Sequence, residues 1–190
     1  LSSRRQRQMC IRDRFSSVLG ATIIQPYPDW HPKLLMAYLT RNTQLALKSF
    51  DYDIHKSAWA DIARSANEHN DPGHFTTFIG YEFTTSTDIE GGNLHRNVIF
   101  NSSEASIRPW TRIDSTNPED LWTWQDRLRE KGVDTIAMPH NSNGSNGQMF
   151  EMETFKGNAI SKEYADKRMR NEPIVEITQV KGTSETHPLL

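Results

Sequence analysis

The sequence is almost free of cysteine, because Cys10 is the single one among 190 residues. One cysteine cannot build an internal disulfide framework, and it cannot supply the several thiolates of a cysteine-rich zinc site. Any bound metal ion would therefore depend on histidine, carboxylate or asparagine side chains. Cysteine usage this low says nothing about the redox compartment.

Long apolar runs and several common catalytic motifs are also missing. No stretch of about 18 apolar residues occurs, which excludes a membrane-spanning helix. No Gly-x-Ser-x-Gly elbow supports a Ser-His-Asp nucleophile, and neither a P-loop nor a dinucleotide fingerprint is present. The chain is 35% apolar and long enough for one globular domain.

Residues 1–14 differ from the rest of the chain, with five arginines, one acid and the lone cysteine. They resemble a translated sequencing-adapter remnant, and we interpret them as an artefact outside the fold rather than a basic nucleic-acid arm or a transit peptide. Without them, 22 − 5 = 17 basic residues face 24 − 1 = 23 acidic ones, a net charge of −6. This acidic balance predicts no nucleic-acid partner, because binding phosphates needs clustered bases.

Two segments carry clear helix signals. Between residues 59 and 66 apolar side chains recur at helical spacing, and the turn-forming residues 70–73 end the pattern. In the second segment Asn117 is a good N-cap, Pro118 takes the first helical position, and the pattern runs to Gly132. A weaker helix pattern begins at Pro32.

Four segments are predicted to be strands. Residues 75–83 are apolar almost throughout, which is typical of a strand buried on both faces, and residues 95–100 are expected beside them. Residues 135–138 and, after a charged stretch, residues 173–180 follow. Alternation of strands and helices predicts an α/β domain.

Glu82, His95 and His140 stand at the ends of three predicted strands. A carboxylate at the end of so apolar a strand is costly to bury without a cation, although an exposed position or an ion pair with Arg96 would also explain it. Each histidine taken singly is more often a hydrogen-bonded core residue than a ligand. Together the three form an oxygen and imidazole set that suits zinc, manganese or iron and could activate water.

Other polar residues complete the predicted site. A loop rich in Gly and Asn follows the third strand, and it is either a flexible surface turn or a place where backbone approaches a substrate. Two further candidates, Glu185 and His187, lie in a polar loop after the last strand. The remaining histidines are expected at the surface: His31, His55, His69 and His74.

Five blocks in order resemble the bacterial domain-of-unknown-function (DUF) 3604 family, which is similar to the PHP (polymerase and histidinol phosphatase) metallohydrolases. The blocks are residues 75–82, 93–100, 118–122, 139–143 and 181–188. The resemblance covers residues 52–190 and leaves residues 15–51 as a weakly assigned N-terminal segment. It implies an α/β fold that is an incomplete portion of a distorted (β/α)7 PHP-type barrel.

The resemblance also implies two or three manganese, zinc or iron ions that hydrolyse phosphate esters. Glu82 would match a glutamate that bridges two metals, and His95 and His140 would match the histidines that end the following strands. The opening His-x-His strand and the Asp-His and Asp-x-His blocks have no counterpart here. We therefore expect residues 52–190 to be a partial domain, truncated at both ends and inactive alone.

Three functions are compatible with these residues. The first is a phosphoesterase in which metal-activated water attacks a small phosphate ester, with Arg96, Asn141 and Asn143 orienting the substrate. The second is hydrolysis of another ester or an amide at the same metal site. The third is a non-catalytic binding module whose histidines are hydrogen-bonded core residues. Localisation stays open, with cytoplasmic, periplasmic and secreted forms all compatible.

Overall fold

The computed structural model describes residues 51–86, 92–105, 108–140, 142–179 and 182–183. The weak helix pattern at Pro32 lies outside these residues. So does the segment interpreted as an artefact.

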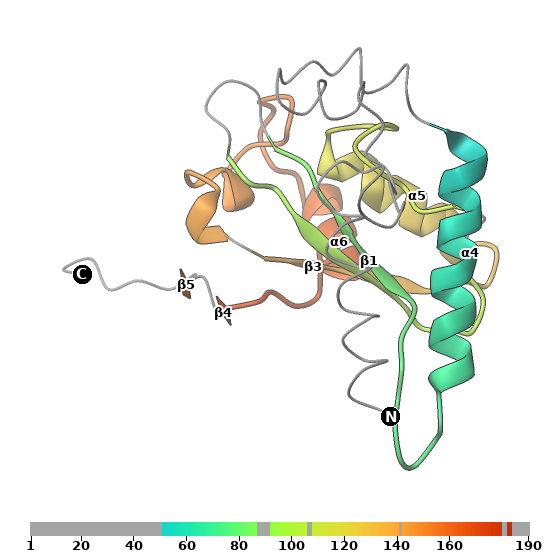
Figure 1. Ribbon diagram of the computed structural model, residues 1–190. Helices are drawn as coiled ribbons and strands as arrows, with labels where there is room; N and C mark the ends of the chain where they lie inside the picture. The colour runs from blue at the N-terminus through green and yellow to red at the C-terminus, as the bar shows by residue number, and fades with distance from the viewer. Residues whose placement is uncertain (1–50, 87–91, 106–107, 141, 180–181, 184–190) are drawn as a thin grey trace, which may run out of the picture.

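A three-stranded sheet forms the centre of the described structure, in the order β1-β2-β3 (Figure 1). The strands are β1 (Gly80–Phe83), β2 (Arg96–Phe100) and β3 (Thr135–Pro139). Both pairings are antiparallel. The expectation that the first two strands are neighbours is confirmed.

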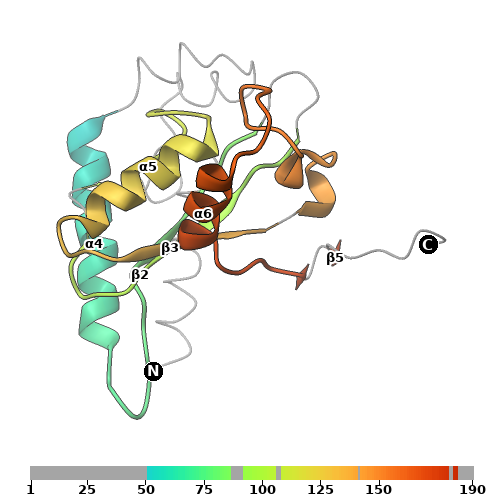
Figure 2. The same ribbon diagram turned by 180° about the vertical axis from the view of Figure 1, so that it is seen from behind.

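Three helices accompany the sheet: α4 (Tyr52–His69), α5 (Pro118–Arg129) and α6 (Lys162–Asn171). Figure 2 shows α5 and α6 in front of the sheet, and Figure 1 shows them behind it, so both cover the same face. The helix α4 begins after Asp51, whose side chain accepts from two backbone amides, and ends at Asn70 as predicted. Asn117 caps α5 in the same way, with Pro118 at the first position.

The core lies between the helices and the sheet. Trp59 on α4 packs edge-on against Tyr81 at 5.5 Å and lies 5.6 Å from Phe100. Val98 and Leu121 close the same cluster and are fully buried. All the strand residues of this cluster point to the helical face, because side chains alternate along a strand.

The first strand is shorter than predicted and is buried on one face only. Residues 76–79 belong to no strand, and Phe78 is 60% exposed. The physical reason is a competing attachment: the Thr77 hydroxyl donates to the carbonyl of Ala66, and the Thr77 amide donates to Asn70 Oδ1. These bonds hold the segment against the end of α4.

The C-terminal part also differs from the expectation. The charged stretch forms α6, which Ser161 caps by accepting from the Tyr164 amide. The strand predicted at residues 173–180 is reduced to β4 (Thr178–Gln179), which pairs with β5 (Gly182–Thr183). Residues 173–177 belong to no named strand.

Among the described residues, no helix is long and apolar enough to cross a membrane. The structure is a mixture of helices with a small antiparallel sheet. The seven-stranded barrel remains a prediction from the resemblance.

Candidate metal centre

The antiparallel pairing brings Glu82, His95 and His140 to one edge of the sheet. Glu82 is near the end of β1, His95 directly precedes β2, and His140 directly follows β3. In antiparallel strands the end of one lies beside the start of the next, so these positions meet. The ladder continues past the strands, because the His140 amide donates to the His95 carbonyl at 3.2 Å.

The three side chains also share one face of the sheet. Arg96 and Pro139 point to the buried helical face, so their neighbours His95 and His140 point to the opposite one. Glu82 is paired in register with Asn97, which also faces away from the helices. Alternation along three strands thus places all three side chains together.

The distances within this group are short. Glu82 Oε1 lies 3.0 Å from His95 Nδ1 and 3.7 Å from His140 Nε2. One ligand atom from each residue lies within 4.8 Å of the other two. The side chains are 24%, 18% and 7% exposed for Glu82, His95 and His140, so a small ion could reach the group while much of it is shielded from water.

The Glu82 carboxylate is held in its charged form. Burial acts to raise the pKa of this carboxyl, but contact with His95 and the nearby His140 outweigh burial and lower the pKa below its usual value. The Thr84 hydroxyl donates to Glu82 Oε1 at 3.1 Å and adds to this effect. Glu82 is therefore an anion at neutral pH and can bind a cation.

The arrangement fits a divalent metal ion. The buried Nδ1 atom of His95 makes no geometrically aligned hydrogen bond within the described part of the chain, although Glu82 Oε1 is only 3.0 Å away. Ligand atoms that surround one zinc ion at about 2.0–2.2 Å are separated by roughly 3.3–3.6 Å in tetrahedral geometry. The two separations from Glu82 lie on either side of this range, so the three side chains could supply three ligands of one ion.

Glu176 is a neighbour of the site that the sequence analysis missed. Its Oε2 atom lies 3.8 Å from Nδ1 of His140, the ring nitrogen that does not face Glu82. Its backbone amide donates to the Pro139 carbonyl at 3.0 Å, which places the segment alongside the end of β3. The acid stands in a predicted strand, and its position beside His140 depends on a long-range contact that no local pattern encodes.

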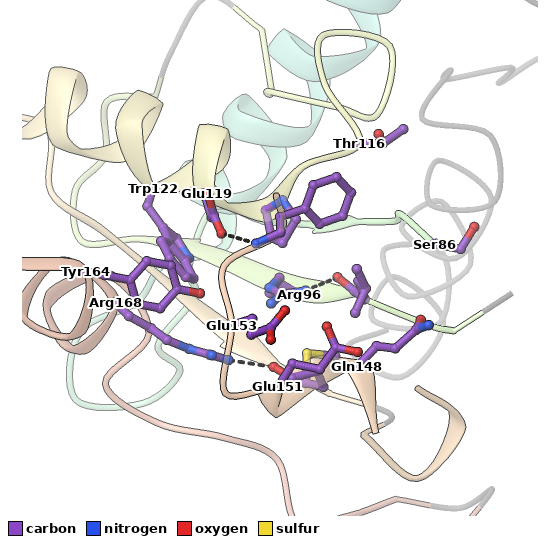
Figure 3. A pocket seen from close by; sticks show the side chains of 14 residues that line it. Ser86, Arg96, Thr116, Glu119, Trp122, Gln148, Glu151, Glu153, Tyr164 and Arg168 are labelled. Carbon is purple, nitrogen blue, oxygen red and sulfur yellow. Dashed lines mark hydrogen bonds between the residues drawn. The ribbon is translucent and has the colours of Figure 1, made fainter. Parts of the chain in front are cut away.

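The structure does not bring Arg96 to the other three residues. Its side chain is 2% exposed on the helical face, where Nε donates to Glu172 Oε1 at 2.7 Å. An ion pair between Arg96 and Glu82 was one explanation that the sequence left open. In the structure Arg96 forms its ion pair with Glu172 instead. Arg96 lines a separate cavity of about 310 Å³ together with Trp122 and Arg168 (Figure 3).

The Gly- and Asn-rich loop forms two short 3-10 helices, η1 (Ser142–Gly144) and η2 (Gln148–Phe150). Asn143 is exposed on η1. The loop packs closely against the chain before His95, because the Asn93 amide donates to the Gly144 carbonyl at 3.0 Å. The other predicted substrate residues lie outside the described residues: Asn141, Glu185 and His187.

One histidine expected at the surface is buried. His55 is 2% exposed, and the charges of Arg108 and Asp114 are close enough to affect it. Burial, and to a smaller extent Arg108, lower the pKa of His55. His74 is exposed as expected, and His69 is half-buried with Nδ1 2.7 Å from the Ser65 carbonyl.

Comparison with known proteins places the chain in a family without assigning its chemistry. Neither the curated proteins nor the solved structures contain a match. The family model described as "Protein of unknown function (DUF3604)" matches residues 25–190. The chain therefore belongs to the DUF3604 family.

Proposed function

We propose that Glu82, His95 and His140 bind a divalent metal ion, and that the chain is part of a metal-dependent hydrolase of the phosphoesterase type. The observation that carries the proposal is the convergence of three ligand-type side chains from three strand ends at one edge of the sheet. An anionic carboxylate facing two imidazoles is a donor set that zinc, manganese and iron accept.

The bound metal ion would supply Lewis-acid chemistry, lowering the pKa of a water molecule and offsetting negative charge that develops on the substrate. The chain's own residues have two roles. Glu82 provides the fixed negative charge, which the Thr84 hydroxyl orients. His95 and His140 provide imidazole nitrogen donors from paired positions of the ladder, with ring centroids 5.8 Å apart.

Phosphate esters are the proposed substrate class because the DUF3604 family, which the motif blocks resemble, is similar to the PHP metallohydrolases. Hydrolysis of another ester or an amide would use the same residues. A phosphodiester, a phosphomonoester and a carboxylic ester with the same chromogenic leaving group would separate hydrolysis of phosphate esters from hydrolysis of carboxylic esters.

The test is metal analysis of the purified chain, followed by titration with zinc and manganese and assays on the three chromogenic substrates. We expect tight binding of one of the two metals in the wild-type chain. Glu82→Gln and His140→Ala should each lower metal affinity by at least about tenfold, because each removes a direct ligand. His74→Ala is the matched control, since this histidine is 83% exposed and lies outside the site.

Two results would contradict the proposal. If the folded wild-type chain binds no metal, the proposed metal site is wrong and a non-catalytic module is favoured. If both site variants keep the wild-type metal affinity, the metal ion binds at another place in the chain. If metal binds as expected, hydrolysis of either phosphate ester supports the phosphoesterase assignment, and hydrolysis of the carboxylic ester alone contradicts it. The metal site stands in both cases.

A further inference from the structure

We infer that Glu176 is a positioning residue that holds the His140 ring with Nε2 toward Glu82. The inference rests on the proposed metal site and adds a residue to it. Glu176 and Glu82 approach different nitrogens of one imidazole: Glu176 Oε2 lies 3.8 Å from Nδ1, and Glu82 Oε1 lies 3.7 Å from Nε2. A histidine flanked in this way can offer one nitrogen to a metal ion while the other faces a carboxylate.

The backbone brings Glu176 to this position and restricts its movement. The bond from the Glu176 amide to the Pro139 carbonyl ties the acid to the residue just before His140. Four residues earlier, Glu172 accepts from Arg96, Trp122 and Arg168, at 2.7, 2.7 and 3.2 Å. The segment that carries Glu176 is therefore attached to the sheet at one point and to the buried helical face at another.

The expected consequence is control of the His140 tautomer. A neutral imidazole carries its proton on one nitrogen and a lone pair on the other. A carboxylate beside Nδ1 stabilises the Nδ1–H form and leaves the Nε2 lone pair directed at the metal position. The Nδ1···Oε2 separation of 3.8 Å is about 0.9 Å longer than the usual N···O separation of an N–H···O hydrogen bond. A rotation of the Glu176 side chain can shorten it, or one water molecule can bridge the two atoms.

The geometry favours this role over direct ligation. Glu176 faces Nδ1 of His140, whereas Glu82 faces Nε2, and Glu176 is not in the group whose ligand atoms lie within 4.8 Å of one another. Its side chain is 27% exposed, and the His140 side chain is 7% exposed. The acid can therefore adjust to the ring, whereas the ring itself is confined.

The first measurement uses the metal-free chain and does not depend on metal binding. Two-bond ¹H–¹⁵N correlation spectra identify which ring nitrogen of His140 carries the proton. We expect the Nδ1–H form in the wild-type chain and in the control Glu130→Gln, an exposed acid at the end of α5. Glu176→Ala should shift His140 toward the Nε2–H form. Glu176→Gln should shift it less, because the amide oxygen still accepts a hydrogen bond.

The second measurement is metal affinity by chelator competition in the same variants. Loss of an outer-shell carboxylate typically lowers metal affinity by about 10- to 100-fold, and we expect this loss in Glu176→Ala, with a smaller loss in Glu176→Gln. Circular dichroism checks that each variant is folded.

The outcomes separate the two proposals. An unchanged His140 tautomer in both Glu176 variants would overturn the positioning role, even if metal binds to Glu82, His95 and His140. A tautomer shifted in the Glu176 variants, together with no metal binding by the wild-type chain, would overturn the proposed metal site and support the positioning of His140. A shifted tautomer with lowered affinity supports both.

Discussion

The backbone amide of His140 donates to the carbonyl of His95, so the two imidazoles leave the sheet from directly paired positions beyond β2 and β3. Glu82 Oε1 is within 3.7 Å of a nitrogen of each ring. This relationship depends on the antiparallel register. A shift of one residue in the pairing of β2 with β3 would turn one strand's side chains to the opposite face and separate the two histidines.

Metal binding should stabilise the folded chain. A metal ion that binds only the folded state at about 100 times its Kd contributes about 2.7 kcal/mol to the free energy of unfolding. We expect the thermal midpoint to rise with zinc or manganese in the wild-type chain and in His74→Ala. It should rise less in His140→Ala, because the weakened site binds the same concentration of metal less completely. An equal rise in both variants would mean that the ion binds at another place.

Removal of the buried Glu172 charge should destabilise the chain strongly. Both Arg96 and the Glu172 carboxylate have side chains that are 2% exposed, and Trp122 Nε1 donates to the same oxygen at 2.7 Å. Glu172→Gln would leave a buried guanidinium without its counter-charge, at a cost of about 3–5 kcal/mol. Urea unfolding measures this, with the exposed Glu130→Gln as the control, expected within about 0.5 kcal/mol of wild type.

The ion pair of Arg108 and Asp114 should make stability depend on acid pH. Burial acts to raise the pKa of Asp114, but hydrogen bonds from Arg108 and from the Thr111 amide at 2.9 Å outweigh it and lower the pKa. A lowered folded-state pKa means that the stabilisation is complete above the unfolded value, about 3.9, and is lost as the pH falls through the folded value.

Asp114→Asn should therefore lower the free energy of unfolding by about 1–3 kcal/mol at pH 7, because hydrogen bonds to a charged group are lost. The difference from wild type should shrink as the pH falls below about 4. Urea unfolding at a series of pH values measures this difference. A difference that stays constant with pH would show that the charge of Asp114 contributes nothing.

Gly92 should be more sensitive to substitution than Gly144. A Cβ atom on Gly92 would lie 2.6 Å from the backbone carbonyl oxygen of Ser145, which cannot move without the loop. On Gly144 the closest atom would be Asn93 Nδ2 at 2.9 Å, at the end of a side chain. Gly92→Ala should displace the chain before His95 and weaken metal binding. Gly144→Ala should change the affinity little. The same loss in both variants would contradict this explanation.

Local signals in the sequence were sufficient for several elements. The helix α5 begins at Pro118 after Asn117, as the capping residues predict, because an N-cap acts within a few residues. The helix α4 follows from apolar spacing and ends at Asn70. In contrast, α6 was missed, because it has no buried apolar face. Met169 is 67% exposed and Asn171 is the buried residue, which attaches the helix to Asp126 of α5 by a hydrogen bond.

That Glu82, His95 and His140 could be metal ligands is predictable from their residue types and from their positions at the ends of predicted strands. Their convergence at one edge was decided by antiparallel register, which depends on pairing between distant segments. Pairing between distant segments also decided that Glu176 lies beside His140, and that Arg96 points away from the site and pairs with Glu172. The sequence by itself determined which groups could bind a metal. Tertiary structure decided which of them meet, because side-chain alternation selects the face and strand pairing selects the neighbours.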